Sequence, residues 1–159
     1  MQVVYVDGPQ PQGAANPSIF LAGPTPQRIE EISWRPEALR LLEELAFDGT
    51  VFVPERSDWL SHFEYDEQCE WEWKHLHGCS AIVFWVPRRL PHFPALTTNV
   101  EFGRYVSLAP NRCVYGRPID SEKNHYLDWL YKKVTGRTPH QDLRGTLIEA
   151  IEVSGRPPG

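Results

Sequence analysis

The sequence predicts a three-layer α/β fold in which a parallel sheet of about five strands carries helices on both faces. Short apolar runs that stop at glycine or proline are typical of strands buried on both faces of a parallel sheet. Longer segments with apolar residues at helical spacing separate these runs. Because strand and helix alternate along the chain, we expect the strands to run parallel and the helices to connect them.

Five short apolar runs are predicted to form the strands. They are rich in valine, isoleucine and aromatic residues and cover residues 3–6, 19–22, 51–54, 81–86 and 113–116. The first run precedes a segment rich in proline and glycine, residues 7–17, which is typical of a loop. We therefore expect 3–6 to form an edge strand and 19–22 to form the first strand of the core.

Five longer segments repeat apolar residues at helical spacing and are predicted to form helices. The first begins near Pro36, a residue favoured in the first turn of a helix, and is expected to stop at Gly49. The others are expected over residues 66–77 and 98–108 and around the apolar stripes 127–134 and 143–150. In the second helix, we expect Cys69, Trp73 and Leu76 to face the core.

Length and composition favour a single domain. The chain has 159 residues, of which 41% are hydrophobic, which suffices for one globular core and not for two independent ones. We therefore interpret residues 1–159 as one domain, in which 1–17 form the N-terminal strand and loop and 155–159 a frayed tail.

Charge, cysteine content and hydropathy exclude several classes of protein. A formal net charge of -5 disfavours a nucleic-acid polymer as partner, because phosphate-backbone binding requires clustered Lys and Arg. Three cysteines without C-x-x-C spacing are typical of free thiols in a reducing compartment. No stretch approaches the ~20 apolar residues of a membrane span, and the first residues do not resemble a signal peptide. We therefore expect a cytoplasmic protein that binds no membrane.

Glu101 is the first candidate catalytic residue. It lies in residues 95–105, which follow the strand 81–86 after a proline-rich loop and are predicted to open a helix. Ligands of open α/β sheets bind in the crevice beyond the carboxyl ends of the strands, where this junction would place Glu101. We interpret Glu101 as a catalytic nucleophile. The alternative is a capping box, in which Thr98 and Glu101 cap the start of the helix.

Glu72 is the second candidate. It belongs to an acidic stretch with Glu67 and Glu70, and such a run is usually the solvated face of a helix. If Glu72 and Glu101 share a cleft, burial and mutual repulsion would raise one pKa and leave one carboxylate ionised. Glycosidic chemistry requires this division between a nucleophile and a proton carrier.

Other catalytic classes find little support. The segment 75–79 offers histidine and cysteine without the spaced pairs of a zinc site. No Gly-x-Ser-x-Gly, G-x-G-x-x-G or P-loop motif is present. Cys69 and Cys79 lie in acidic surroundings that disfavour a thiolate nucleophile. The segment 23–28 follows the strand 19–22 and is either a plain turn or a site for a sugar or phosphate.

Three short motifs together resemble the nucleoside 2-deoxyribosyltransferase family. They are Ile-Phe-Leu-Ala-Gly-Pro at 19–24, Trp71-Glu72, and Thr-Asn-Val-Glu-Phe-Gly at 98–103. The chain most closely resembles the 2-deoxyribosyltransferase-like branch, with further similarity at 34–38, 53–55, 84–87 and 116–118. The resemblance implies a flavodoxin-like (Rossmann-like) three-layer sandwich, no metal, no cofactor, and assembly into a dimer or a higher oligomer.

The resemblance also implies roles for individual residues. Glu101 would attack the anomeric carbon and form a covalent glutamyl-sugar intermediate, and Glu72 replaces a family aspartate. Phe20 replaces a family tyrosine that orients the nucleophile, Ala95 replaces an aspartate that engages the base, and Trp71 replaces an asparagine. The residues expected around the substrate are Phe20, Gly23, Pro24, Thr25, Trp71, Ala95, Thr98 and Asn99. Because the side chain of Ala95 has no proton to donate, the candidate donors to the leaving base are Asn99, Asp66 and Arg88.

The implied activity is cleavage of the N-glycosidic bond of a nucleoside and 2-deoxyribosyl transfer to a free nucleobase, as in nucleotide salvage. The first alternative is a hydrolase of nucleosides or nucleoside 5′-monophosphates, with Thr25, Gln27 or Arg28 binding a phosphate. The second is a catalytically inactive nucleotide-binding sensor, since two polar family residues are replaced. Four aromatic residues are candidates either to stack on a nucleobase or to cover the core: Trp59, Phe63, Trp71 and Phe93.

Overall fold

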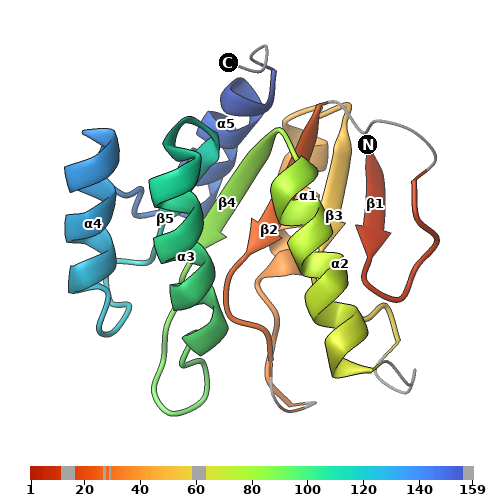
Figure 1. Ribbon diagram of the computed structural model, residues 1–159, viewed down its shortest axis with the longest axis horizontal. Coiled ribbons are helices and arrows are strands. Elements are labelled where there is room, and N and C mark those ends of the chain that lie inside the picture. Colours follow the sequence, from red (N-terminus) through yellow and green to blue (C-terminus); the bar gives the residue numbers. More distant parts are fainter. Residues whose placement is uncertain (12–16, 27, 29, 59–63, 156–159) are drawn as a thin grey trace.

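The computed structural model describes residues 1–11, 17–26, 28, 30–58 and 64–155. Its centre is a five-stranded parallel sheet with the strand order β1-β3-β2-β4-β5 (Figure 1). The strands are β1 (Gln2–Tyr5), β2 (Ser18–Ala22), β3 (Thr50–Val53), β4 (Ala81–Trp85) and β5 (Cys113–Gly116). The helices are α1 (Arg35–Glu44), α2 (Tyr65–Gly78), α3 (Leu96–Leu108), α4 (His125–Thr135) and α5 (Leu143–Ser154). The predicted α/β class and parallel sheet are confirmed.

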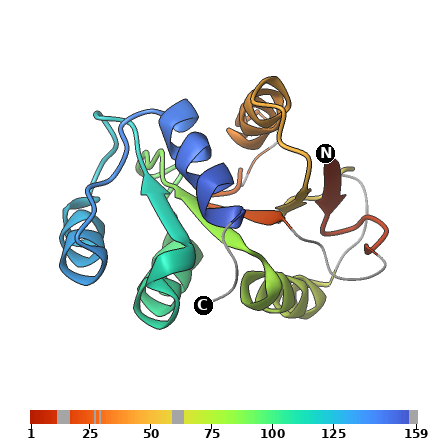
Figure 2. The same cartoon turned by 90° about the horizontal axis from the view of Figure 1, so that it is seen from above.

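Helices cover both faces of the sheet. Seen from above, α1 and α5 lie on one face, and α2, α3 and α4 lie on the other (Figure 2). Side chains of the strands alternate between these two layers, so Ile19 and Leu21 pack under α1 and α5 while Phe20 and Ala22 pack under the opposite layer. Because both faces of the sheet are covered, the sequences of the central strands are nearly continuous apolar runs.

Two helix boundaries differ from the prediction. Helix α1 ends at Glu44 and not near Gly49, because Ala46 adopts a left-handed φ of 55° and turns Phe47 back into the core. Helix α3 begins at Leu96, two residues earlier than expected, after Ala95, which also has a φ of 55°. Left-handed alanine is uncommon, so the sequence carries no signal for either turn.

The inward face of α2 also differs from the prediction. Leu76 is buried as expected, but Cys69 is exposed and Trp73 is half exposed. The buried row is instead Trp71, His75 and Leu76. Trp71 packs on Phe20 of β2, with a ring-centroid distance of 5.9 Å. Residues two apart point to opposite sides of a helix, so burial of Trp71 turns Trp73 toward solvent.

The strand order creates a crevice at one end of the sheet. The chain passes from β2 outward to β3 and then returns across β2 to β4, so β2 and β4 are neighbours at a topological switch point. In open α/β sheets, ligands bind beyond the carboxyl ends of the strands at such a point. None of the described helices is both long enough and apolar enough to span a bilayer.

Gly23 makes the close approach at this crevice possible. Its φ is +156°, which side-chain-bearing residues rarely adopt. A Cβ at this position would lie 2.2 Å from the carbonyl oxygen of Trp85 and 2.8 Å from the ring of Trp34. The end of β2 can therefore contact both β4 and the start of α1 only with glycine at position 23.

We predict that Gly23→Ala lowers the free energy of unfolding by roughly 2 kcal/mol or more, because the added methyl group clashes with backbone and meets a strained conformation. Gly103→Ala is the matched control. A Cβ at Gly103, within α3, would meet no atom within 4 Å, so this change should be neutral or stabilise by up to ~1 kcal/mol. Urea denaturation of both variants measures the difference, and equal effects would contradict the packing described at Gly23.

Candidate active site

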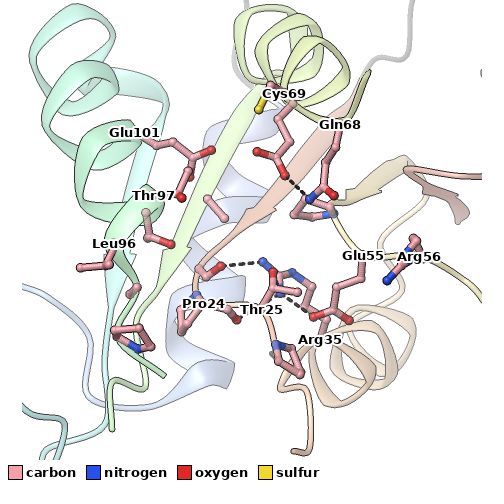
Figure 3. A pocket seen from close by; sticks show the side chains of 18 of the residues that line it. Pro24, Thr25, Arg35, Glu55, Arg56, Gln68, Cys69, Leu96, Thr97 and Glu101 are labelled. Atoms are coloured by element: carbon pink, nitrogen blue, oxygen red, sulfur yellow. Dashed lines mark hydrogen bonds and ion pairs between the residues drawn. The ribbon is translucent and has the colours of Figure 1, made fainter. Parts of the chain in front are cut away.

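A pocket of about 520 Å³ opens at the carboxyl ends of the strands. Five segments line it: the loop after β2, Arg35 at the start of α1, the loop after β3, one face of α2, and the first two turns of α3 with the residues before it (Figure 3). The pocket therefore occupies the crevice expected from the strand order.

Glu101 lies in the second turn of α3 and extends toward this pocket (Figure 3). Because the helix begins at Leu96, Thr98 is inside its first turn and no side chain caps the helix start. The capping-box interpretation of Thr98 and Glu101 is therefore wrong. Burial and, secondarily, the charge of Glu72 raise the pKa of Glu101 to about 8, although the positive charge of Arg35 opposes the rise.

Helix α2 contributes the second carboxyl group. Tyr65, Gln68, Cys69 and Glu72 lie three or four residues apart, on one face of the helix, and all line the pocket. Burial raises the pKa of Glu72, while a hydrogen bond from Gln68 and the charge of Arg35 oppose the rise. Glu72 is half-buried, so it does not belong to a purely solvated face.

Arg35 is the buried positive group of the site, with 1% of its surface exposed. Its guanidinium donates to the carbonyl oxygens of Leu21 at 3.0 Å, Pro24 at 3.2 Å and Gly23 at 2.8 Å. It also pairs with Glu55 Oε1 at 2.6 Å. Arg35 therefore joins the loops after β2 and β3 to the first turn of α1, and its charge acts on Glu72 and Glu101.

The structure brings together most of the residues predicted for the site. Those that line the pocket are Glu72, Glu101, Gly23, Pro24, Thr25, Ala95 and Thr98. Phe20 and Trp71 are buried in the core and are not among the lining residues. Asn99 accepts a hydrogen bond from the guanidinium of Arg88 and is not among them either.

The three candidate proton donors are not among the lining residues. Asp66 is exposed on α2, and Arg88 is buried beside Asn99 and the loop before α4. Of the aromatic candidates, Phe93 is half-buried in the loop before α3. Gln27, Trp59 and Phe63 lie outside the described residues, and Arg28 is exposed.

Among the lining residues that sequence reasoning missed, three are polar groups that interact with one another or with Glu72: Arg35, Glu55 and Gln68. Gln68 carries a usable signal, because it lies four residues before Glu72 on a predicted helix. Arg35 and Glu55 are far apart in the chain and form their ion pair only in the folded state, so no local pattern marks them. Across the described ranges, no group of three or more His, Cys, Asp or Glu side chains could hold a metal ion.

A comparison with protein families finds a match. The family described as "Nucleoside 2-deoxyribosyltransferase like" matches residues 16–117, more than half of the chain. The chain belongs to this family. The match covers β2 to β5 and every lining residue of the pocket, so the resemblance inferred from three motifs is confirmed. In this nucleoside 2-deoxyribosyltransferase-like protein, α4 and α5 follow the matched region. A comparison with curated proteins finds no match.

We predict that Glu101 makes stability depend on pH. The pKa of its carboxyl is raised to about 8 in the folded protein from an ordinary value of 4.5, so between these pH values the folded state keeps a proton that the unfolded state releases. Stability is therefore lost as pH rises through this window, by about 1.4 kcal/mol for each unit of pKa shift as an upper bound. Glu101→Gln should be more stable than the wild type at pH 8, with a smaller difference near pH 5.

Thermal unfolding at several pH values measures this effect. Glu70→Gln is the control, because Glu70 is exposed on α2 and is not among the pocket residues. A stability difference between Glu101→Gln and wild type that stays constant from pH 5 to pH 8 would contradict a raised Glu101 pKa.

Proposed function

We propose that this protein cleaves the N-glycosidic bond of a 2′-deoxynucleoside and transfers the sugar to another nucleobase. The observation that carries the proposal is the pair of carboxyl groups, Glu72 from α2 and Glu101 from α3, which line one pocket and both have raised pKa values. Membership of the nucleoside 2-deoxyribosyltransferase-like family supports the same class of reaction.

In the first step, the ionised Glu101 carboxylate attacks the anomeric carbon of the sugar. The bond from this carbon to the base nitrogen breaks as the ester bond to Glu101 forms, and its electron pair stays on the base. Glu72 donates its proton to the base, which leaves as a neutral molecule. The Glu101 carboxylate also stabilises the oxocarbenium-like charge of the transition state.

This step requires a proton on Glu72 and none on Glu101. In the free protein, burial and the charge of Glu72 raise the pKa of Glu101 to about 8, so Glu101 holds a proton at neutral pH. As the bond to the base lengthens, positive charge develops on the sugar beside Glu101 and favours the ionised form of this carboxyl. Because the two groups titrate as a pair, the proton then resides on Glu72, next to a basic nitrogen of the departing base.

In the second step, an acceptor base takes the place of the first. Its nitrogen attacks the anomeric carbon, its proton passes to the Glu72 carboxylate, and Glu101 leaves as a carboxylate. Two displacements at one carbon retain the anomeric configuration. Water in place of the acceptor base would release the free sugar, which is the N-glycosidase reaction.

The first turn of α3 supports binding of the sugar. Thr97 and Thr98 both line the pocket, and Thr97 extends toward it from α3 (Figure 3). Hydroxyl groups both donate and accept hydrogen bonds, so these side chains suit the sugar oxygens. Because they lie one turn before Glu101, a sugar that they bind would lie beside the proposed nucleophile.

We also propose that the protein forms at least a dimer through α3. Leu96, Val100 and Leu108 on this helix are exposed by 71%, 73% and 66%. Burial of apolar surface of this kind drives association of subunits. Leu96 also lines the pocket, so a partner that covers α3 would close one side of it. Sedimentation of the purified protein tests this proposal, and a monomer at micromolar concentration would contradict it.

The central test is a product assay. The protein is incubated with a 2′-deoxynucleoside, with and without a second free base, and the products are separated by chromatography. We predict a new nucleoside only when the acceptor is present, and a loss of turnover of roughly 10³-fold or more in Glu101→Gln because the nucleophile is absent. Glu70→Gln should retain wild-type turnover.

Each other outcome of this assay points to a different function. Free base and sugar released at the same rate without acceptor would make the protein a hydrolase, and turnover of 5′-monophosphates only would identify a nucleotide substrate. Ligand-induced thermal stabilisation without turnover would identify a sensor. Wild-type activity in Glu101→Gln would remove Glu101 from the mechanism.

A further inference from the structure

Gln68 and Glu72 form a hydrogen-bonded pair inside the wall of the pocket. Gln68 Nε2 donates to Glu72 Oε1 at 2.9 Å, and both residues line the pocket from α2. Gln68 extends from α2 toward the pocket, which Glu101 approaches from α3 (Figure 3). Pairs of this kind on a solvated helix contribute little to helix stability. Here both side chains are half-buried and next to the proposed substrate site, so the hydrogen bond affects how the Glu72 carboxyl meets a substrate.

The hydrogen bond distinguishes the two oxygens of the Glu72 carboxyl. Oε1 accepts from the Gln68 amide, and within the described residues no hydrogen bond to Oε2 is found. A proton on the carboxyl is therefore favoured on Oε2, because a proton on Oε1 would face the amide donor. The bond also fixes the rotation of the carboxyl group, which otherwise turns freely about its last torsion.

We propose that Gln68 is a positioning residue, which holds the Glu72 carboxyl so that Oε2 presents its proton to the leaving nucleobase. This inference rests on the proposed function. When the bond between the anomeric carbon and the base breaks, the proton moves from Oε2 to the base nitrogen. The negative charge that remains on Glu72 is stabilised by the Gln68 amide, because a hydrogen bond to an ionised group is stronger than one to a neutral group. The acceptor base returns its proton to the same oxygen.

The charged groups around Glu72 determine how the pH dependence of the reaction rate should change when Gln68 is replaced. Glu101 faces it from α3, Arg35 from α1, and Tyr65 and Cys69 from its own helix, while Glu55 and Arg56 line the pocket from the loop after β3. Burial raises the pKa of Glu72 and the Gln68 hydrogen bond lowers it. Loss of that bond should raise the pKa further, so the basic limb of the pH profile should move to higher pH even as the rate falls.

The test compares two substrates of wild type, Gln68→Met and Glu72→Gln. One substrate is a 2′-deoxynucleoside, whose base needs a proton to leave. The other is 4-nitrophenyl 2-deoxyriboside, whose leaving group departs as an anion and needs none. We expect Gln68→Met to lower kcat for the nucleoside roughly 10- to 100-fold. This loss is part of the rate enhancement of ~10²–10⁴-fold that a general acid supplies. Release of 4-nitrophenolate in the first turnover, which needs no proton from Glu72, should occur within about threefold of the wild-type rate.

Controls separate this role from a structural one. Gln68→Ala is the second variant, because alanine favours the helix, and Glu70→Met is the matched control on the exposed face of α2. Equal losses for both substrates in the Gln68 variants, or a nucleoside rate like that of the wild type, would overturn the role of Gln68 and leave the proposed function intact. A wild-type protein that turns over neither substrate would overturn the proposed function and this inference with it.

Discussion

The buried guanidinium of Arg35 is the constraint on which the site depends. A charge removed from water must find hydrogen-bond acceptors and a counter-ion, or the fold is destabilised by several kcal/mol. Arg35 finds them in the carbonyl groups at the end of β2 and in the loop that follows it, and in Glu55 after β3. These bonds hold the loop at Gly23 against the ends of β4 and α1. The hydrogen bonds of Arg35 therefore both shape the pocket at Gly23 and hold β2, β4 and α1 together.

The same charge governs the chemistry of the two carboxyl groups. Burial raises the pKa of both Glu72 and Glu101, and their proximity raises that of Glu101 further. Arg35 opposes both shifts, so one of the two groups can be ionised at neutral pH without a direct salt bridge. The proposed reaction uses this balance, because it needs one carboxylate and one carboxylic acid within reach of the same sugar. Gln68 makes the two glutamates different, because it donates a hydrogen bond to Glu72 and not to Glu101.

The sequence predicts the layers of this fold because alternation and apolar runs are local properties. It predicts Glu101 and Glu72 because each lies in a short motif at the expected end of the sheet. It does not predict Arg35 and Glu55, whose pairing joins distant segments, nor the left-handed Ala95 that sets the start of α3. The prediction that Cys69 and Trp73 face the core was wrong. The rings of Phe20 and Phe52 on the sheet pack against Trp71 and His75, so these two residues form the inward face of α2.

The proposed reaction requires a covalent bond between Glu101 and the sugar. Rapid acid quenching of the protein with a 2′-deoxynucleoside, followed by proteolysis and mass spectrometry, would detect it. We predict one peptide, the one that contains Glu101, heavier by a deoxyribosyl group in the wild type and unmodified in Glu101→Gln. Continued turnover with no modified peptide, or a modification on the peptide that contains Glu72, would contradict the account.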